Sequence, residues 1–162
     1  MKDTAREGTG MKGRSVTQFY ESDHDRLDGL FRSFQQLKGT VLEQAGSCFR
    51  EFQEGLLRHM LWEEEILFPL FDRKAGPDAG GLTQAMKSEH AVIRTYLDRI
   101  RDQVQLRSGE TDEAEGKLLE ALSAHNVKEE QILYPAIDGA IDADELSHIF
   151  RSMKRSREGL LL

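Results

Sequence analysis

The strongest constraint on the fold is an internal repeat, because the second half of the chain carries a pattern of the first half 66 residues later. Residues 59–69 read HMLWEEEILFP and residues 125–135 read HNVKEEQILYP, with histidine, glutamate and proline at matching positions. The tripeptides SDH at residues 22–24 and SEH at residues 88–90 match at the same offset. Two similar halves predict a fold with a pseudo-two-fold axis.

Apolar residues recur every three to four positions through most of the chain, which is the period of an amphipathic helix. This spacing predicts five helices, at residues 16–39, 41–67, 82–104, 111–133 and 144–154. Pro69 is expected to bend or stop the second helix, and Pro135 to stop the fourth, because proline cannot donate a helical hydrogen bond. No segment alternates with period two. The expected fold class is therefore all-α, an antiparallel up-down-up-down four-helix bundle whose short fifth helix caps one end or lies along the side.

The length and composition indicate one domain that does not bind nucleic acid or membranes. Residues 1–14 lack periodicity and are expected to be a flexible arm, while residues 15–156 form the bundle domain. A net charge of −7 argues against nucleic-acid binding, and no apolar run is long enough to span a bilayer. Cys48 is the only cysteine, so no intramolecular disulfide can form, and no secretory signal opens the chain. We expect a cytoplasmic monomer or weak homodimer.

The repeat preserves polar residues that can bind metal. A histidine and a glutamate four residues apart share one face of a helix, and this pair occurs in both halves. A further histidine lies in each half, three positions before an apolar inward residue. We therefore expect six side chains to converge on the axis of the bundle, namely His24, His59, Glu63, His90, His125 and Glu129.

Burying these side chains without a metal would be unfavourable, because two ionised carboxylates would face each other in an apolar interior. Two cations reverse this cost if each binds two imidazoles and both glutamates bridge them, at a separation of roughly 3.5–4 Å. Imidazole and carboxylate ligands suit iron, and other first-row metals remain possible. Such a centre keeps open coordination positions for a small ligand. The alternative is that each histidine is an ordinary half-buried residue, but four histidines repeated in pairs argue against it.

Several neighbouring residues receive other interpretations. Glu64, Glu65 and Glu130 point away from the shared face, so they are expected at the surface or in support of the ligands. Trp62 and Tyr134 are interpreted as packing residues.

The chain resembles the hemerythrin-like, or HHE cation-binding, family in four pieces, namely ESDHDRL, RHMLWEEEILFP, KSEHAVI and AHNVKEEQILYP. The resemblance covers about residues 16–150. It implies a four-helix bundle with a non-haem di-iron centre, two iron ions with an oxo or hydroxo bridge, on the six residues named above.

The resemblance is incomplete at the third helix. Oxygen-carrying hemerythrins have a second histidine four residues after the first on that helix, where this chain has Arg94, and a bridging aspartate five residues after the last histidine, where this chain has Glu129 at four. The pattern is closer to members linked to nitric oxide response and iron–sulfur cluster repair, although the cysteine-bearing N-terminal domain of those proteins is not expected here. Asp28 is the repeat equivalent of Arg94, and we expect Asp28 either to pair with Arg94 or to supply an extra ligand.

Three functions remain open at this level. The first is a di-iron protein that binds O2, NO or peroxide as a sensor, store or scavenger in a stress response. The second is a di-iron redox enzyme or iron donor in NO or peroxide detoxification or iron–sulfur cluster repair, with an unknown redox partner and unknown catalytic residues. The third is a bundle that binds no metal.

Overall fold

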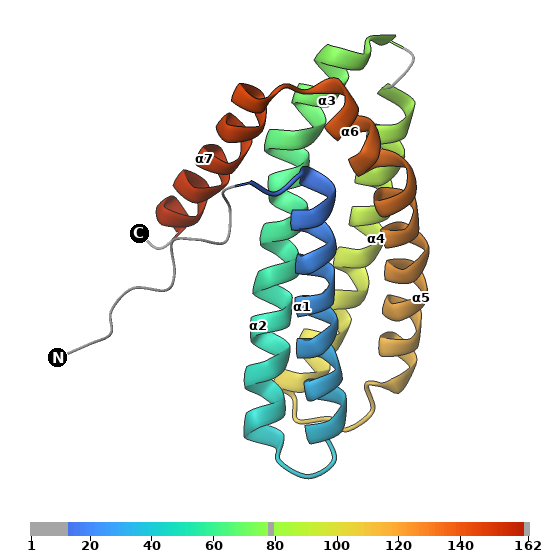
Figure 1. Ribbon diagram of the computed structural model, residues 1–162. Helices are drawn as coiled ribbons and strands as arrows, with labels where there is room; N and C mark the ends of the chain where they lie inside the picture. Colours follow the sequence, from blue (N-terminus) through green and yellow to red (C-terminus); the bar gives the residue numbers. More distant parts are fainter. Residues whose placement is uncertain (1–12, 78–79, 161–162) are drawn as a thin grey trace, which may run out of the picture.

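The long helices alternate in direction, as the periodicity predicts (Figure 1). The computed structural model describes residues 13–77 and 80–160, and every regular element in these ranges is a helix. The bundle consists of α1 (Val16–Leu37), α2 (Leu42–Trp62), α4 (Gly80–Gln105) and α5 (Asp112–Lys128). The expected all-α bundle is confirmed. Most of the expected N-terminal arm, residues 1–12, lies outside the described residues.

The start of α1 is held by its own cap and by the other half of the chain. Ser15 and Gln18 form a capping box, in which each side chain bonds the other residue's backbone. Asp138 accepts hydrogen bonds from the backbone of Val16 at 2.8 Å and from the backbone and hydroxyl of Thr17 at 3.0 and 2.6 Å. A carboxylate at a helix N-terminus satisfies unpaired N–H groups and interacts favourably with the helix dipole. Asp138 belongs to α6 (Tyr134–Ala140), so this contact fixes the start of α1 against α6.

Neither proline stops its helix, which corrects the expectation for Pro135 and one of the two alternatives for Pro69. After α2 the chain makes one turn of π-helix, η1 (Glu63–Leu67), and continues as α3 (Phe68–Ala75). After α5 it does the same through η3 (Glu129–Leu133) into α6 (Tyr134–Ala140). Each proline stands in the first turn of the new α-helix, where its missing N–H is tolerated. The backbone N–H of the residue before it instead reaches the carbonyl five residues back.

The last helix, α7 (Ala143–Leu160), is longer than the predicted segment and packs against the bundle near one end. In Figure 1 it leaves the axis of the bundle and lies beside the end where α1 begins. Its buried face packs into an apolar cluster with the beginning of α1 and with α3, through Ile149, Phe150 and Met153. Its position combines the two predicted placements, because it packs along the side of the bundle near one end.

The core consists of two apolar clusters rather than one. The first includes Tyr20, Phe68 and Ile149 near the α7 end, and the second includes Phe52 and Leu97 toward the opposite end. Between the clusters lies a layer of buried polar side chains.

Candidate metal centre

The polar layer contains the six residues that the repeat singles out. Each of the four bundle helices supplies one histidine, and each π-helical turn begins with one glutamate. None of the six side chains is more than 5% exposed, and Glu63, His90 and Glu129 are fully buried. The structure therefore brings together all six side chains, four imidazoles and two carboxylates, in an enclosed space.

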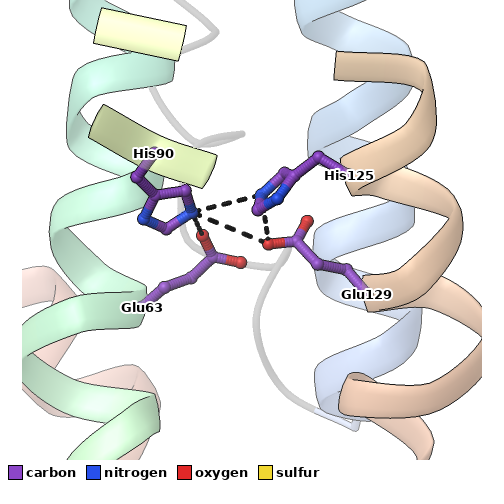
Figure 2. A group of neighbouring side chains, drawn as sticks. All are labelled: Glu63, His90, His125 and Glu129. Carbon is purple, nitrogen blue, oxygen red and sulfur yellow. Dashed lines mark hydrogen bonds and ion pairs between the residues drawn. The ribbon is translucent and has the colours of Figure 1, made fainter. Parts of the chain in front are cut away.

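Four of these side chains form a compact group around His90 (Figure 2). The Nε2 atom of His90 lies 3.2 Å from Glu63 Oε2 and 3.1 Å from His125 Nε2. Glu129 Oε1 lies 2.7 Å from His125 Nε2 and 3.8 Å from His90 Nε2. Bonds of about 2.0–2.2 Å from a first-row metal would hold adjacent ligand atoms about 3 to 3.5 Å apart. The distances of His90 Nε2 from Glu63 Oε2 and His125 Nε2 fall in this range, and those of Glu129 Oε1, 2.7 and 3.8 Å, lie on either side of it, so the four atoms can surround one cation.

A second group lies beside the first and shares a member with it. His24, His59 and Glu129 offer ligand atoms within 4.8 Å of one another. His24 Nε2 is 3.2 Å from His59 Nε2 and 3.2 Å from Glu129 Oε2, and Glu63 Oε1 lies 3.5 Å from His59 Nε2. Each glutamate thus turns one carboxylate oxygen toward each group.

The two carboxylates have oxygens that the described residues leave unsatisfied. Glu63 Oε2 and Glu129 Oε1 are buried without a well-formed hydrogen bond from any part of the chain that the structure describes. The imidazole nitrogens of His90 and His125 lie close to them but not in bonding orientation. Buried carboxylate oxygens need a positive partner, and a cation in each group would provide it. The donor set therefore fits two cations.

Each imidazole is oriented by a carboxylate outside the centre. The Nδ1–H of each ring donates to a carboxylate 2.6 to 2.9 Å away, in the pairs His24–Glu130, His59–Asp23, His90–Glu64 and His125–Glu89. The four pairs obey the 66-residue repeat. With Nδ1 protonated, the lone pair on each Nε2 points inward, which is the arrangement that metal-binding histidines adopt.

The electrostatics of the centre favour positive charge. Burial by itself would lower the pKa of His59, but the charge of Glu63 and the hydrogen bond to Asp23 outweigh it and raise this pKa to about 10. Burial also opposes protonation of His90, yet its contacts with Glu129 and Glu63 raise the pKa of that ring to about 9. Without a metal, the site compensates its carboxylates by binding protons. Metal ions would replace those protons.

Tyr134, which the sequence interpretation assigns to packing alone, contacts the candidate metal centre directly. Its hydroxyl donates to Glu63 Oε1 at 2.5 Å and to Glu129 Oε2 at 2.8 Å, and lies 3.4 Å from His59 Nε2. Burial, followed by the charges of Glu129 and Glu63, raises the pKa of Tyr134 well above its ordinary value, so the phenol keeps its proton here. No sequence signal separates it from a packing aromatic, because Phe68 is its repeat equivalent.

The supporting carboxylates were only partly anticipated. Glu64 and Glu130 were expected at the surface or in support, and they take the supporting place. The sequence pattern assigns no role to Asp23 and Glu89, although an acidic residue directly precedes the first histidine of each half and is a usable signal for this support. Glu65 is exposed.

Asp28 and Arg94 do not form the expected pair. Arg94 donates a hydrogen bond to Glu64 Oε1 at 3.0 Å. A carboxylate therefore compensates the charge of Arg94, but this carboxylate comes from η1 and not from Asp28. Asp28 is exposed, lines a surface pocket with His24 and Glu130, and belongs to neither group of ligand atoms. Each residue instead lies near the carboxylate that supports the histidine one turn before it, Arg94 with Glu64 and Asp28 with Glu130.

Comparison with known proteins agrees with the geometry. The model of the family described as "Hemerythrin HHE cation binding domain" matches residues 15–155. The chain belongs to this hemerythrin family. Cation binding is a property that membership implies, and the His/Glu groups are the candidate site for it. None of the described helices is long and apolar enough to cross a membrane.

Curated relatives of this hemerythrin-family chain are distant. An uncharacterised hemerythrin-like protein of Schizosaccharomyces pombe is 21% identical over 136 residues, which are 84% of this chain and 66% of that protein. Iron-sulfur cluster repair proteins YtfE of Yersinia pestis and Yersinia pseudotuberculosis are 38% identical over 52 residues, 32% of this chain and 24% of theirs. The chain therefore spans less than two thirds of the length of these relatives. No solved structure matches it.

Proposed function

We propose that this protein holds two iron ions in the polar layer and binds a small ligand, O2, NO or peroxide, at that centre. The observation that carries the proposal is the sharing of both carboxylates between the two groups. Glu63 and Glu129 each direct one oxygen to the His90 side and one to the His59 side. Shared carboxylates of this kind suit a pair of cations rather than one.

The residues around the centre support ligand binding. Two imidazoles and two carboxylate oxygens amount to four donors per cation, which leaves room for a ligand on a metal of higher coordination number. Iron supplies reversible redox chemistry and affinity for diatomic ligands when it is bound. The protein holds the imidazoles by their outer carboxylates and excludes bulk water with the two apolar clusters. His24 also lines a surface pocket, so the exterior approaches the centre on that side.

Metal content is the direct test, and Glu129 is the informative residue because it belongs to both groups. Wild-type protein purified after expression with added iron should contain two irons per chain. Glu129→Ala should lose most of both, while Glu65→Ala, an exposed neighbour of the other π-helical turn, should keep them. Wild-type protein with fewer than about half a metal per chain would contradict the proposal and favour a bundle that binds no metal.

A second candidate is an iron-dependent redox enzyme or iron donor for cluster repair. The similarity to Iron-sulfur cluster repair protein YtfE favours it, although only 52 residues are compared. Iron-loaded protein mixed with excess peroxide or NO distinguishes the two candidates. A ligand-binding protein takes up a fixed amount per centre, whereas an enzyme consumes many equivalents, and an iron donor loses its metal to an acceptor protein.

A further inference from the structure

The two halves of the centre differ in their aromatic surroundings, despite the repeat. Tyr134 in the second half corresponds to Phe68 in the first, and Tyr20 in the first half corresponds to Met86 in the second. Both tyrosines lie on the same side of the centre, because their rings stack at 4.8 Å and Tyr20 packs edge-on against His59 at 4.8 Å. On the other side, Phe68 stacks on His90 at 5.9 Å.

The two groups also differ in how compact their histidine and carboxylate donors are. The group around His90 has four donor atoms close together, whereas the group with His24, His59 and Glu129 has three, and its fourth donor, Glu63 Oε1, lies 3.5 Å from His59 Nε2. The hydroxyl of Tyr134 offers this looser group a further donor. It lies 2.8 Å from Glu129 Oε2 and 3.4 Å from His59 Nε2, the separations expected between adjacent ligand atoms of one cation.

We propose that Tyr134 is a phenolate ligand of the cation held by His24, His59 and Glu129, so that the two metal positions are chemically different. This inference rests on the proposed function, since it needs the metals to be bound. When the metal–oxygen bond forms, the O–H bond of Tyr134 breaks and its proton leaves to solvent through the carboxylates that now accept it. A bound cation favours this loss, as it does for other coordinating acids. The phenolate also offsets one positive charge of a buried trivalent ion.

Position 134 should accept phenylalanine in place of tyrosine. Phe68 occupies the equivalent place on the other side of the centre, fully buried, so the fold accepts a phenyl ring there. Tyr134→Phe should therefore keep the bundle and remove only the hydroxyl. Tyr20 is the competing donor, because its hydroxyl is buried and has no hydrogen-bond partner among the described residues.

The experiment compares visible absorption and resonance Raman spectra of protein loaded with ferric iron. Wild type should show a phenolate-to-iron(III) charge-transfer band with phenolate ring modes. Tyr134→Phe should lose both while still binding two irons. The double variant of the other two tyrosines, Tyr20→Phe with Tyr96→Phe, should keep the charge-transfer band and the phenolate ring modes. Because Tyr134 is then the one tyrosine left in the chain, this result assigns the band to Tyr134 even if Tyr134→Phe does not fold. Phe68→Tyr should strengthen the band up to twofold.

A second readout avoids iron altogether. Loading with zinc in weakly buffered solution should release one more proton per chain from wild type than from Tyr134→Phe. Wild type with two irons and no phenolate band would overturn the inference and leave the di-iron proposal intact, and so would a band that survives in Tyr134→Phe. Wild type that binds no iron would overturn the proposed function itself.

Discussion

Each inner histidine has a carboxylate behind it, and at the scale of single residues this is the most informative feature of the protein. The pair of His24 with Glu130 is the clearest case, since the ring nitrogen and the carboxylate oxygen are 2.6 Å apart. On the other side the equivalent Glu64 is shared between His90 and Arg94. A carboxylate in this position fixes the ring orientation and makes the inner nitrogen a stronger ligand.

Removing that support should weaken metal binding without removing a ligand. Glu130→Ala is expected to lower iron or zinc affinity by roughly 10- to 100-fold, the usual cost of losing an outer partner of a metal-binding histidine. Competition with a chelator of known affinity measures this change. Glu65→Ala is the control and should bind as wild type does. Equal affinities in the two variants would show that Glu130 has no supporting role.

At the scale of elements, the position of the glutamates depends on the π-helical turns. Glu63 and Glu129 are the first residues of these turns, and the prolines that follow prevent the usual helical hydrogen bond at their own positions. Such insertions often accompany functional sites. Contacts between the halves also help to fix the helices, among them the bonds from the start of α1 to Asp138.

Loss of that contact should destabilise the bundle. Asp138→Ala leaves two backbone N–H groups and one hydroxyl of α1 without their acceptor, at an expected cost of about 2 kcal/mol in the free energy of unfolding. Urea denaturation at saturating metal measures it. Asp25→Ala, at an exposed position on α1, should stay within about 0.5 kcal/mol of wild type. A similar result for Asp138→Ala would mean that water replaces this carboxylate.

Two helical glycines, one buried between α1 and α2 and one with open space on α5, should respond in opposite ways to replacement by alanine. A Cβ atom at Gly55 would lie 2.8 Å from Leu27 Cδ2, in a buried part of the interface, whereas Gly116 of α5 has open space. Gly116→Ala should stabilise the protein by about 0.5–1 kcal/mol through helix propensity. Gly55→Ala should destabilise it by roughly 1–2 kcal/mol because the interface must shift. Thermal unfolding of both variants tests this, and equal gains would show that the interface yields freely.

At the scale of the whole molecule, the polar layer divides the core into two apolar clusters. A layer with two fully buried carboxylates weakens a bundle unless something compensates their charge. Protons on the histidines compensate it in part, as the raised pKa values of His59 and His90 indicate. Two cations would do so completely, which couples metal binding to the stability of the fold.

Removal of the metal should therefore lower the melting temperature. A metal at 100 times its dissociation constant adds about 2.7 kcal/mol, which for a chain of this size corresponds to a fall of about 5–10 °C on chelation. Differential scanning calorimetry with and without chelator measures the fall. Glu129→Ala should show little response to chelator. An unchanged wild-type melting temperature would mean that the metal does not stabilise the native state.

Much of this architecture is readable from the sequence, and the reason is the repeat. Helical periodicity and the matched spacing at 66 residues predict the bundle. They also predict that the histidines and the glutamates four residues after them face inward, since these residues share the helix face of the apolar positions. Helix ends were less predictable. Pro69 and Pro135 were expected to bend or stop helices, and the chain continues because a π-helical turn places each proline where its missing N–H costs little.

Contacts between helices were decided only by the tertiary structure. Arg94 pairs with Glu64 and not with Asp28, because the partner depends on how the helices are rotated against one another. The hydroxyl of Tyr134 reaches both glutamates, while sequence periodicity shows merely that the residue is buried. The sequence by itself determined which residues face the axis, since a helical period is a local property. The tertiary structure decided which of them touch, since distances between helices are set by packing of the whole chain.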